Sequence, residues 1–364
     1  MKKFLAISLT LVLVLGLAAC GNSGEPAKDT KDNKTYEIAM ITDIGSIDDK
    51  SFNQGTWEGV VAYADKNKVT CKYYKPTEQT TDAYLAAIQL AVQGGAKVVV
   101  TPGFLFEVPI YQAQDLYKDV NFILIDGYPN DGAKDNPTYR TAENAVGIKF
   151  AEEQSGYLAG YAAVMEGYTK LGFMGGMAVP AVVRYGYGFA QGAEAAAKEL
   201  KIKNIDLKYH YTGNFDATPE AQTLASSWYA EGTEVIFAAG GAVGNSVMSA
   251  AAAAGKKVIG VDVDQSSESP TVITSAMKDL SAAVESTLEQ YYAEKFPGGQ
   301  SLTLGAADNG VQLPMETSKF EAFAQGNYDA VYADLAAGKI VLQKDEVKSA
   351  ADLGLKIVKI TVVE

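Results

Sequence analysis

"YEIAMITDIGSIDDKSFNQG", residues 36–55, places a short apolar run directly before a polar loop. The loop carries three aspartates and leads to Phe52 and Asn53, where a helix is expected to begin. An apolar strand followed by a turn and a helix is typical of the first unit of a parallel α/β sheet. A turn needs a glycine and one aspartate at most, so this loop has more polarity than a turn requires.

Strand-like and helix-like segments alternate along both halves of the chain. The folded part begins near Tyr36 and is too long for one typical core, which predicts two lobes. Short strands rich in valine and isoleucine, each followed by a helix, predict parallel sheets covered on both faces. The expected strands after the first are "VTCKYYK", "KVVVTPG" and "NFILID" in the first half, and "KLGFMGG", "DLKYHYTG", "EVIFAAGG" and "KVIGVD" in the second.

Polar residues stand where several of these strands end. Asp43 follows the first strand, Asp126 ends "NFILID", and Gly241 follows "VIFAA", while Asp262 ends "VIGVD". Ligands of open parallel sheets bind beyond the carboxyl ends of the strands. Two lobes that face each other would bring these residues to one cleft.

The residue types argue against catalysis, and we expect no enzyme activity, no metal and no cofactor. His210 is the only histidine and lies in a strand-like segment, and Cys71 is the only cysteine besides Cys20. Nucleophilic catalysis needs a base beside its serine or cysteine. Paired carboxylates also perform glycoside chemistry, but acids at strand ends equally hold sugar hydroxyls without reaction. The glycine loops lack the Lys-Ser/Thr pair of a phosphate-binding P-loop.

The charge of the chain excludes further ligand classes. The formal net charge is −13, and it becomes −15 once a leader containing Lys2 and Lys3 is removed. An acidic surface repels nucleic acid, so no nucleic-acid partner is expected. Arg140 and Arg184 are the only arginines, which disfavours a polyphosphate ligand because bidentate phosphate recognition favours arginine.

These residues fit a polar, flat, uncharged ligand. Carboxylates accept hydrogen bonds from hydroxyl and ring N–H groups, and aromatic rings stack on planar bases. Phe52 either meets such a ligand or faces the core. In "RYGYGFAQG", Tyr185 meets the ligand if its aromatic neighbours pack inward. Lys278, at the end of "VITSAMK", is either a solvated surface charge or a ligand contact at a lobe crossing.

The N-terminus has the pattern of a secretory leader. Two lysines precede "FLAISLTLVLVLGLAA", which ends at Cys20. A basic start, a short apolar core and small residues before a cleavage site indicate a signal peptide over residues 1–19. "LAAC" resembles a bacterial lipobox, which predicts a lipidated Cys20, a flexible tether over 20–35 and a location on the outer side of the cell membrane. The alternative is an ordinary signal peptide with an incidental cysteine.

Five motifs together resemble the basic membrane protein family. They are "TDIGSIDDKSFNQGTWEG", "ILIDG", "RYGYGFAQG", "VIGVDVDQ" and "TSAMKD". Members of this family are substrate-binding lipoproteins of ATP-binding cassette importers, and the characterised ones bind purine nucleosides. The resemblance implies a purine nucleoside ligand, membrane permease and ATPase subunits as partners, and attachment to the membrane by lipid. We expect the protein to be a monomer.

The family's fold is the type I periplasmic-binding-protein architecture, with two doubly wound α/β lobes and a three-stranded hinge. On this resemblance the N-terminal lobe comprises residues 36–143 and about 279–308. The C-terminal lobe comprises 144–274 and about 314–364. The hinge crossings are expected near 143–147, 274–278 and 308–313.

The resemblance also assigns roles to site residues. It implies that Phe52 stacks on the base, with Asn53 and the Asp43 carboxylate as polar contacts beside it. The acid after "ILI" falls on Asp126, and the ribose-binding pair falls on Asp262 and Lys278.

The second stacking aromatic, commonly phenylalanine in the family, falls on Tyr185. The extra hydroxyl group is a departure that could shift the preference for the base. A sugar or an autoinducer furanose would use similar acids and aromatics, and a surface receptor lipoprotein could keep the same fold. Both alternatives stay open.

Overall fold

The computed structural model describes residues 35–363. The predicted signal peptide (1–19), Cys20 and all but the last residue of the predicted tether (20–35) lie outside the described residues. Within the described part, no helix has the length and apolar character needed to span a membrane.

The first sheet is wholly parallel and has the strand order β11-β5-β4-β3-β1-β2. Along β1, Ile38 and Met40 face the core formed with helices α1 and α8, while Ala39 and Ile41 face the core formed with α2 and α3. This two-residue alternation explains why the strand is apolar throughout: both of its faces are covered. The elements are β1 (Ile38–Ile41), α1 (Phe52–Asn67), β2 (Cys71–Tyr74), α2 (Thr81–Gln93), β3 (Val98–Pro102), η1 (Phe104–Phe106), α3 (Glu107–Leu116), β4 (Asn121–Ile125), β5 (Ala145–Phe150), α8 (Leu280–Tyr292) and β11 (Ser301–Leu304).

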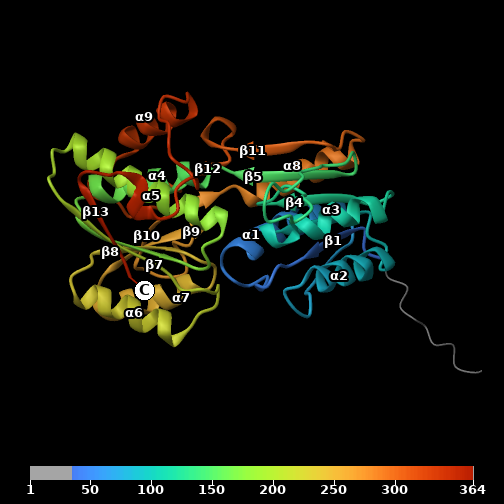
Figure 1. The fold of residues 1–364 in the computed structure, drawn as a ribbon, viewed down its shortest axis with the longest axis horizontal. Helices are drawn as coiled ribbons and strands as arrows, with labels where there is room; N and C mark the ends of the chain where they lie inside the picture. The colour runs from blue at the N-terminus through green and yellow to red at the C-terminus, as the bar shows by residue number, and fades with distance from the viewer. Residues whose placement is uncertain (1–34, 364) are drawn as a thin grey trace, which may run out of the picture. The chain divides into compact units, whose positions relative to one another are not determined.

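The second sheet has the order β12-β10-β9-β8-β6-β7-β13, and β12 alone pairs antiparallel, with β10. Helices α4 and α5 cover one face, and α6 and α7 cover the other. The expected α/β architecture with two parallel-sheet lobes is confirmed (Figure 1). The elements are α4 (Glu152–Met165), β6 (Lys170–Gly175), α5 (Pro180–Glu199), β7 (Ile205–Tyr211), α6 (Pro219–Ala230), β8 (Val235–Ala239), α7 (Val243–Ala254), β9 (Lys257–Asp262), β10 (Val272–Lys278), η2 (Ala306–Asp308), β12 (Val311–Gln312), α9 (Gln325–Ala336), η3 (Ala350–Leu353) and β13 (Val358–Val362).

Helices α4 and α5 pack backbone against backbone. A Cβ atom on Gly156 would lie 2.2 Å from the carbonyl oxygen of Tyr185, and one on Gly188 would lie 2.1 Å from that of Glu153. Gly160 and Gly192 repeat this arrangement one turn further along each helix. Only glycine permits so close an approach, and the two helices run in the same direction, so their first turns lie side by side.

Within residues 35–363 the chain passes between the two sheets three times. The passages follow β5 at Ala151, β10 at Asp279, and β11 in the segment 305–310. The first differs from the prediction, which placed residues 144–150 in the second lobe and the crossing at 143–147. Strand β5 pairs with β4 and β11, and its apolar side chains are buried in the first sheet, so the lobe boundary lies after Phe150.

Candidate functional site

A cavity of about 280 Å³ lies where the loops after the strands of both sheets meet. All eight residues predicted from the sequence line it: Asp43, Phe52, Asn53, Asp126, Tyr185, Gly241, Asp262 and Lys278. The residues predicted at the strand ends and those implied by the family resemblance thus border the same cavity. The roles of the individual side chains remain predictions.

The loop after β1 is organised around Asp49. Its buried carboxylate accepts hydrogen bonds from the backbone N–H groups of Ser51, Asn53 and Gln54, which are otherwise unpaired at the start of α1. It also accepts from the Asn53 side chain at 3.0 Å. Burial raises the pKa of Asp49 to about 6, although these hydrogen bonds act in the opposite direction.

Asn53 in turn fixes Asp43. The Asn53 Nδ2 atom donates to Asp43 Oδ1 at 3.0 Å, and the same oxygen accepts from the Gly45 backbone at 2.7 Å. Both of these hydrogen bonds are made to Oδ1, and within residues 35–363 the Oδ2 atom of Asp43 has no side-chain or backbone hydrogen bond. Burial raises the pKa of Asp43 above its ordinary value, which the Gly45 and Asn53 hydrogen bonds partly offset.

Phe52 is the first residue of α1 and borders the cavity with part of its ring exposed. The rest of the ring packs against the main core. The Lys278 ammonium lies 4.5 Å from the ring centroid, within the range of a cation–π contact. The two possibilities left open by the sequence are therefore both partly realised: Phe52 faces the cavity and is supported by the core.

Lys278 is a buried cation among three carboxylates, not a surface charge. Its Nζ atom donates a hydrogen bond to Asp126, lies 3.3 Å from Asp262 Oδ1 and lies 3.7 Å from Glu152 Oε1. Only 2% of the lysine side chain is exposed. Asp126 comes from the first sheet and Asp262 from the second, so one lysine joins acids from both lobes.

Two of these acids have an unusual backbone. Asp126 and Asp262 have φ angles of 58° and 65°, in the left-handed region, and each stands at the carboxyl end of a strand. Aspartate tolerates this conformation better than most residues do, and residues held in it gather at functional sites. Ser51 Oγ donates to Asp262 Oδ2 at 2.5 Å, a second link between the sheets.

The cluster contains more negative than positive charge. Burial raises the pKa of Asp126 and outweighs the opposing effect of Lys278, because Glu152 and Asp262 lie nearby. Burial would also raise the pKa of Glu152, but Arg184 and Lys278 together lower it below the ordinary value. The Lys278 ammonium stays charged, since burial is outweighed by Asp126, Asp262 and Glu152.

Asp126 has an unused acceptor. Within residues 35–363, its Oδ1 atom is buried and has no hydrogen-bond partner. Leaving a buried acceptor unpaired costs about 1–3 kcal/mol.

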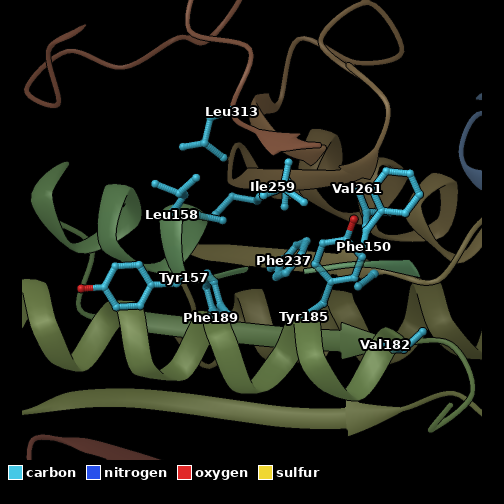
Figure 2. Close-up of a cluster of buried hydrophobic side chains, with 14 of the residues drawn as sticks. Phe150, Tyr157, Leu158, Val182, Tyr185, Phe189, Phe237, Ile259, Val261 and Leu313 are labelled. Carbon is cyan, nitrogen blue, oxygen red and sulfur yellow. The ribbon is translucent and has the colours of Figure 1, made fainter. Parts of the chain in front are cut away.

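Tyr185 reaches the cavity from the second lobe. Only 2% of the residue is exposed, and its ring meets Phe237 edge to face at a centroid distance of 5.7 Å. Figure 2 shows the ring among the buried side chains around Phe237 and Phe150. The hydroxyl donates to Asp262 Oδ1 at 3.4 Å, a long hydrogen bond. The tyrosine hydroxyl that departs from the family's pattern thus has a partner inside the protein.

Gly241 lies in the loop between β8 and α7. Its φ of 56° places it in the left-handed region, which glycine adopts without cost. Its neighbour Gly240 touches the Gly176 backbone, where a Cβ would lie 2.6 Å from the Gly176 nitrogen. The two glycines bring bare backbone to the wall of the cavity.

Sequence reasoning missed Glu152, Arg184 and Asp49 as members of the site. Arg184 Nε donates to Glu152 Oε2 at 2.7 Å, and both side chains are almost fully buried. The pair of glycines four residues apart in each helix was the available signal, because it brings the start of α4 to the start of α5. Asp49 could have been found as the helix cap before α1.

His210 and Cys71, which the sequence analysis did not assign to the site, lie outside the cavity. The His210 Nδ1 atom hydrogen-bonds to the Val363 backbone at 2.7 Å, on a strand away from the cavity. Cys71 is a free cysteine on β2. Among the described residues, no group of histidine, cysteine and acidic side chains is arranged to hold a metal ion.

The model of the Bmp family, described as ABC transporter substrate-binding protein PnrA-like, matches residues 36–340. The chain belongs to this family. Members are substrate-binding proteins of ABC transporters and not enzymes, as the residue types predicted.

Two relatives show how similar this chain is to other proteins over nearly its full length. It is 28% identical over 343 residues to the ABC transporter nucleoside-binding protein BmpA of Lactococcus lactis, covering 88% of this chain and 93% of that protein. It is 30% identical over 337 residues to the CD4+ T-cell-stimulating antigen of Listeria monocytogenes, covering 86% and 90%.

Solved structures support the fold. An ABC transporter solute-binding protein of Aeropyrum pernix superposes with a TM-score of 0.72 at 20% identity, covering 86% of this chain and 94% of that one. A second solute-binding protein, from Conexibacter woesei, superposes with a TM-score of 0.68 at 24% identity, covering 85% of this chain and 99% of that one. At these identities the likeness shows the type I binding-protein fold alone.

Proposed function

We propose that this Bmp-family protein binds purine nucleosides in the cavity between its two lobes and delivers them to an importer. The observation that carries the proposal is an aromatic ring beside unused carboxylate acceptors. Phe52 offers a stacking surface, Asp43 has one oxygen left, and Asp126 Oδ1 has no partner within residues 35–363. The nucleoside-binding relative in Lactococcus lactis supports the same ligand class.

The two ends of a nucleoside need different contacts, and the cavity offers both. A base presents planar faces and N–H donors, which suit Phe52 and Asp43. A ribose presents hydroxyl groups, which suit Asp262, Lys278 and the unpaired oxygen of Asp126. Asp43 belongs to the first lobe and Asp262 to the second, so one nucleoside would span the cleft.

The test is ligand binding by the purified protein. Thermal shift screening should compare inosine, guanosine and adenosine with free bases, arabinose, ribose and nucleoside monophosphates, followed by calorimetry. A ligand at 100 times its dissociation constant adds about 2.7 kcal/mol to stability, so a nucleoside should raise the melting temperature clearly. Stabilisation by a sugar but by no nucleoside would contradict the proposal and favour a sugar-binding role.

The lipid anchor and the partners belong to the same proposal. A lipidated Cys20 would hold a monomer at the outer face of the membrane, next to the permease, while the ATPase subunit works from the cytoplasm. Cys20→Ser should release a folded, nucleoside-binding protein from the membrane fraction. Mass spectrometry that finds an intact leader with unmodified Cys20 in the native protein would contradict the anchor.

A further inference from the structure

We infer that Glu152, held by Arg184, is a positioning residue that keeps the Lys278 ammonium at the point in the cavity where it meets the ligand. The inference rests on the proposed function, because it concerns how one ligand contact is placed.

The contacts form a continuous chain from Lys278 to the surface. Glu152 Oε1 lies 3.7 Å from the Lys278 ammonium, and Glu152 Oε2 accepts from Arg184 Nε at 2.7 Å. Arg184 Nη1 then donates to Asp345 Oδ2 at 3.0 Å, and 37% of the Asp345 side chain is exposed. Cations and carboxylates therefore alternate along this chain of contacts.

Glu152 is not itself placed to bind a ligand. It is fully buried and is not among the residues that line the cavity. Its Oε1 atom has no hydrogen-bond partner within residues 35–363 and lies 3.7 Å from the Lys278 ammonium. Burying an ionised carboxylate is costly unless it is paired. Arg184 pairs with one carboxylate oxygen of Glu152, and the other oxygen lies 3.7 Å from Lys278, so the pair places a fixed negative charge beside the lysine.

The helix pair explains how these residues meet. Glu152 begins α4 immediately after the first passage between the sheets, and Arg184 lies in the first turns of α5. The glycine contacts between α4 and α5 hold the two starts together. Lys278 ends β10 immediately before the second passage. Glu152 and Lys278 therefore each stand beside a passage between the two sheets, while Arg184 lies within the second lobe.

Lys278 has competing partners, which is why it needs support. Asp126 approaches it from the first sheet and Asp262 from the second. The Phe52 ring lies 4.5 Å from its ammonium, and the Tyr185 ring lies 5.5 Å away. Of the three carboxylates near Lys278, Glu152 is the one that does not line the cavity, so its charge acts on the ligand only through the lysine.

The decisive experiment compares two ligands in matched variants of the full chain. Inosine carries both ribose hydroxyls, and 2′,3′-dideoxyinosine lacks them while keeping the same base. Glu152→Gln keeps the shape of the side chain and removes its charge. Glu153→Gln is the matched control, since Glu153 is the adjacent glutamate, is also buried, and pairs with Lys344 at 3.6 Å instead of Lys278.

We expect E152Q to lower the affinity for inosine by roughly 10- to 100-fold. This is the range found when the residues that support metal ligands are replaced. Binding of dideoxyinosine should hardly change, so the preference for inosine should shrink. E153Q should bind both ligands like the unmodified protein. Arg184→Met should act like E152Q, and Arg184→Lys should recover part of the loss because it keeps the charge but not the two-pronged geometry.

Three results would overturn the inference. The first is an E152Q protein with unchanged affinity for inosine, and the second is an equal loss of affinity for inosine and dideoxyinosine. The third is a lower melting temperature with an unchanged ratio of the two affinities. If the unmodified protein bound neither nucleoside while remaining folded, the proposed function would itself be wrong. The behaviour of the unmodified protein therefore distinguishes the two failures.

Discussion

Phe52 is the residue at which a ligand-binding role and a structural role separate most clearly. If its ring stacks on a base, Phe52→Ala removes an interaction worth about 1–3 kcal/mol, or roughly 5- to 150-fold in affinity. Inosine is the reference ligand for this measurement. The loss should appear in calorimetry as a raised dissociation constant with unchanged stoichiometry.

The effect on the unliganded protein should be modest. Part of the Phe52 ring is already exposed to the cavity, and its contact with the Lys278 ammonium is worth about 0.5–2 kcal/mol. We therefore expect F52A to lower the free energy of unfolding by about 1–2 kcal/mol. A fully buried phenylalanine would lose about 3–5 kcal/mol on the same change.

Phe122 supplies the matched control. It is fully buried in β4 and faces the core under α2 and α3, and it is not among the cavity residues. Phe122→Ala should lose about 3–5 kcal/mol of stability and keep its inosine affinity. If F52A instead showed the large destabilisation and the unchanged affinity, Phe52 would be a core residue and the base would lie elsewhere.

The remaining predictions concern the second aromatic, the ligand charge and pH. Tyr185→Phe should lose less than about 1 kcal/mol of binding, because its 3.4 Å hydrogen bond to Asp262 is long; a loss of tenfold or more in calorimetry would show that the hydroxyl contacts the ligand. Inosine should bind at least about tenfold more tightly than its 5′-monophosphate, since a phosphate would lie among buried carboxylates, and equal affinities would refute this. Unfolding followed in denaturant should show the unliganded protein becoming less stable between about pH 5 and pH 7, because a raised carboxylate pKa makes the native state bind more protons than the unfolded state. Asp126→Asn should flatten this dependence, and a stability that rises with pH over the same interval would contradict the charge surplus.

The sequence predicted the cavity residues because one rule of parallel sheets applies locally. Asp43, Asp126 and Asp262 each follow a recognisable apolar strand, and the carboxyl ends of such strands share an edge. Lys278 is the last residue of β10, and Phe52 begins α1 after the loop that follows β1, so both border the same cavity. The resemblance to a known family supplied their expected roles, not their positions in a cavity.

Contacts between distant segments could not be predicted in the same way. "AVGIKF" is apolar and strand-like whichever sheet it joins. The local sequence therefore could not predict that it pairs with β4 and β11, nor where the boundary between the lobes lies. Glu152 follows that strand, and its sequence context predicts only an acidic residue at the start of a helix. Its pairing with Arg184 depends on the close approach of two helices, and its contact with Lys278 depends on a strand more than a hundred residues later.

The charge balance of the cluster explains how a cavity so rich in acids can suit an uncharged ligand. Lys278 and Arg184 stand against Asp126, Asp262 and Glu152, so the buried groups retain a surplus of negative charge. An anion would add to that surplus at low dielectric, where repulsion is strong. A cation would compete with Lys278 for the same oxygens. Under the proposed function, a neutral molecule with several hydrogen-bond donors would pair with the acceptors of the cavity without displacing either cation, and binding would then depend on hydrogen bonds and not on charge.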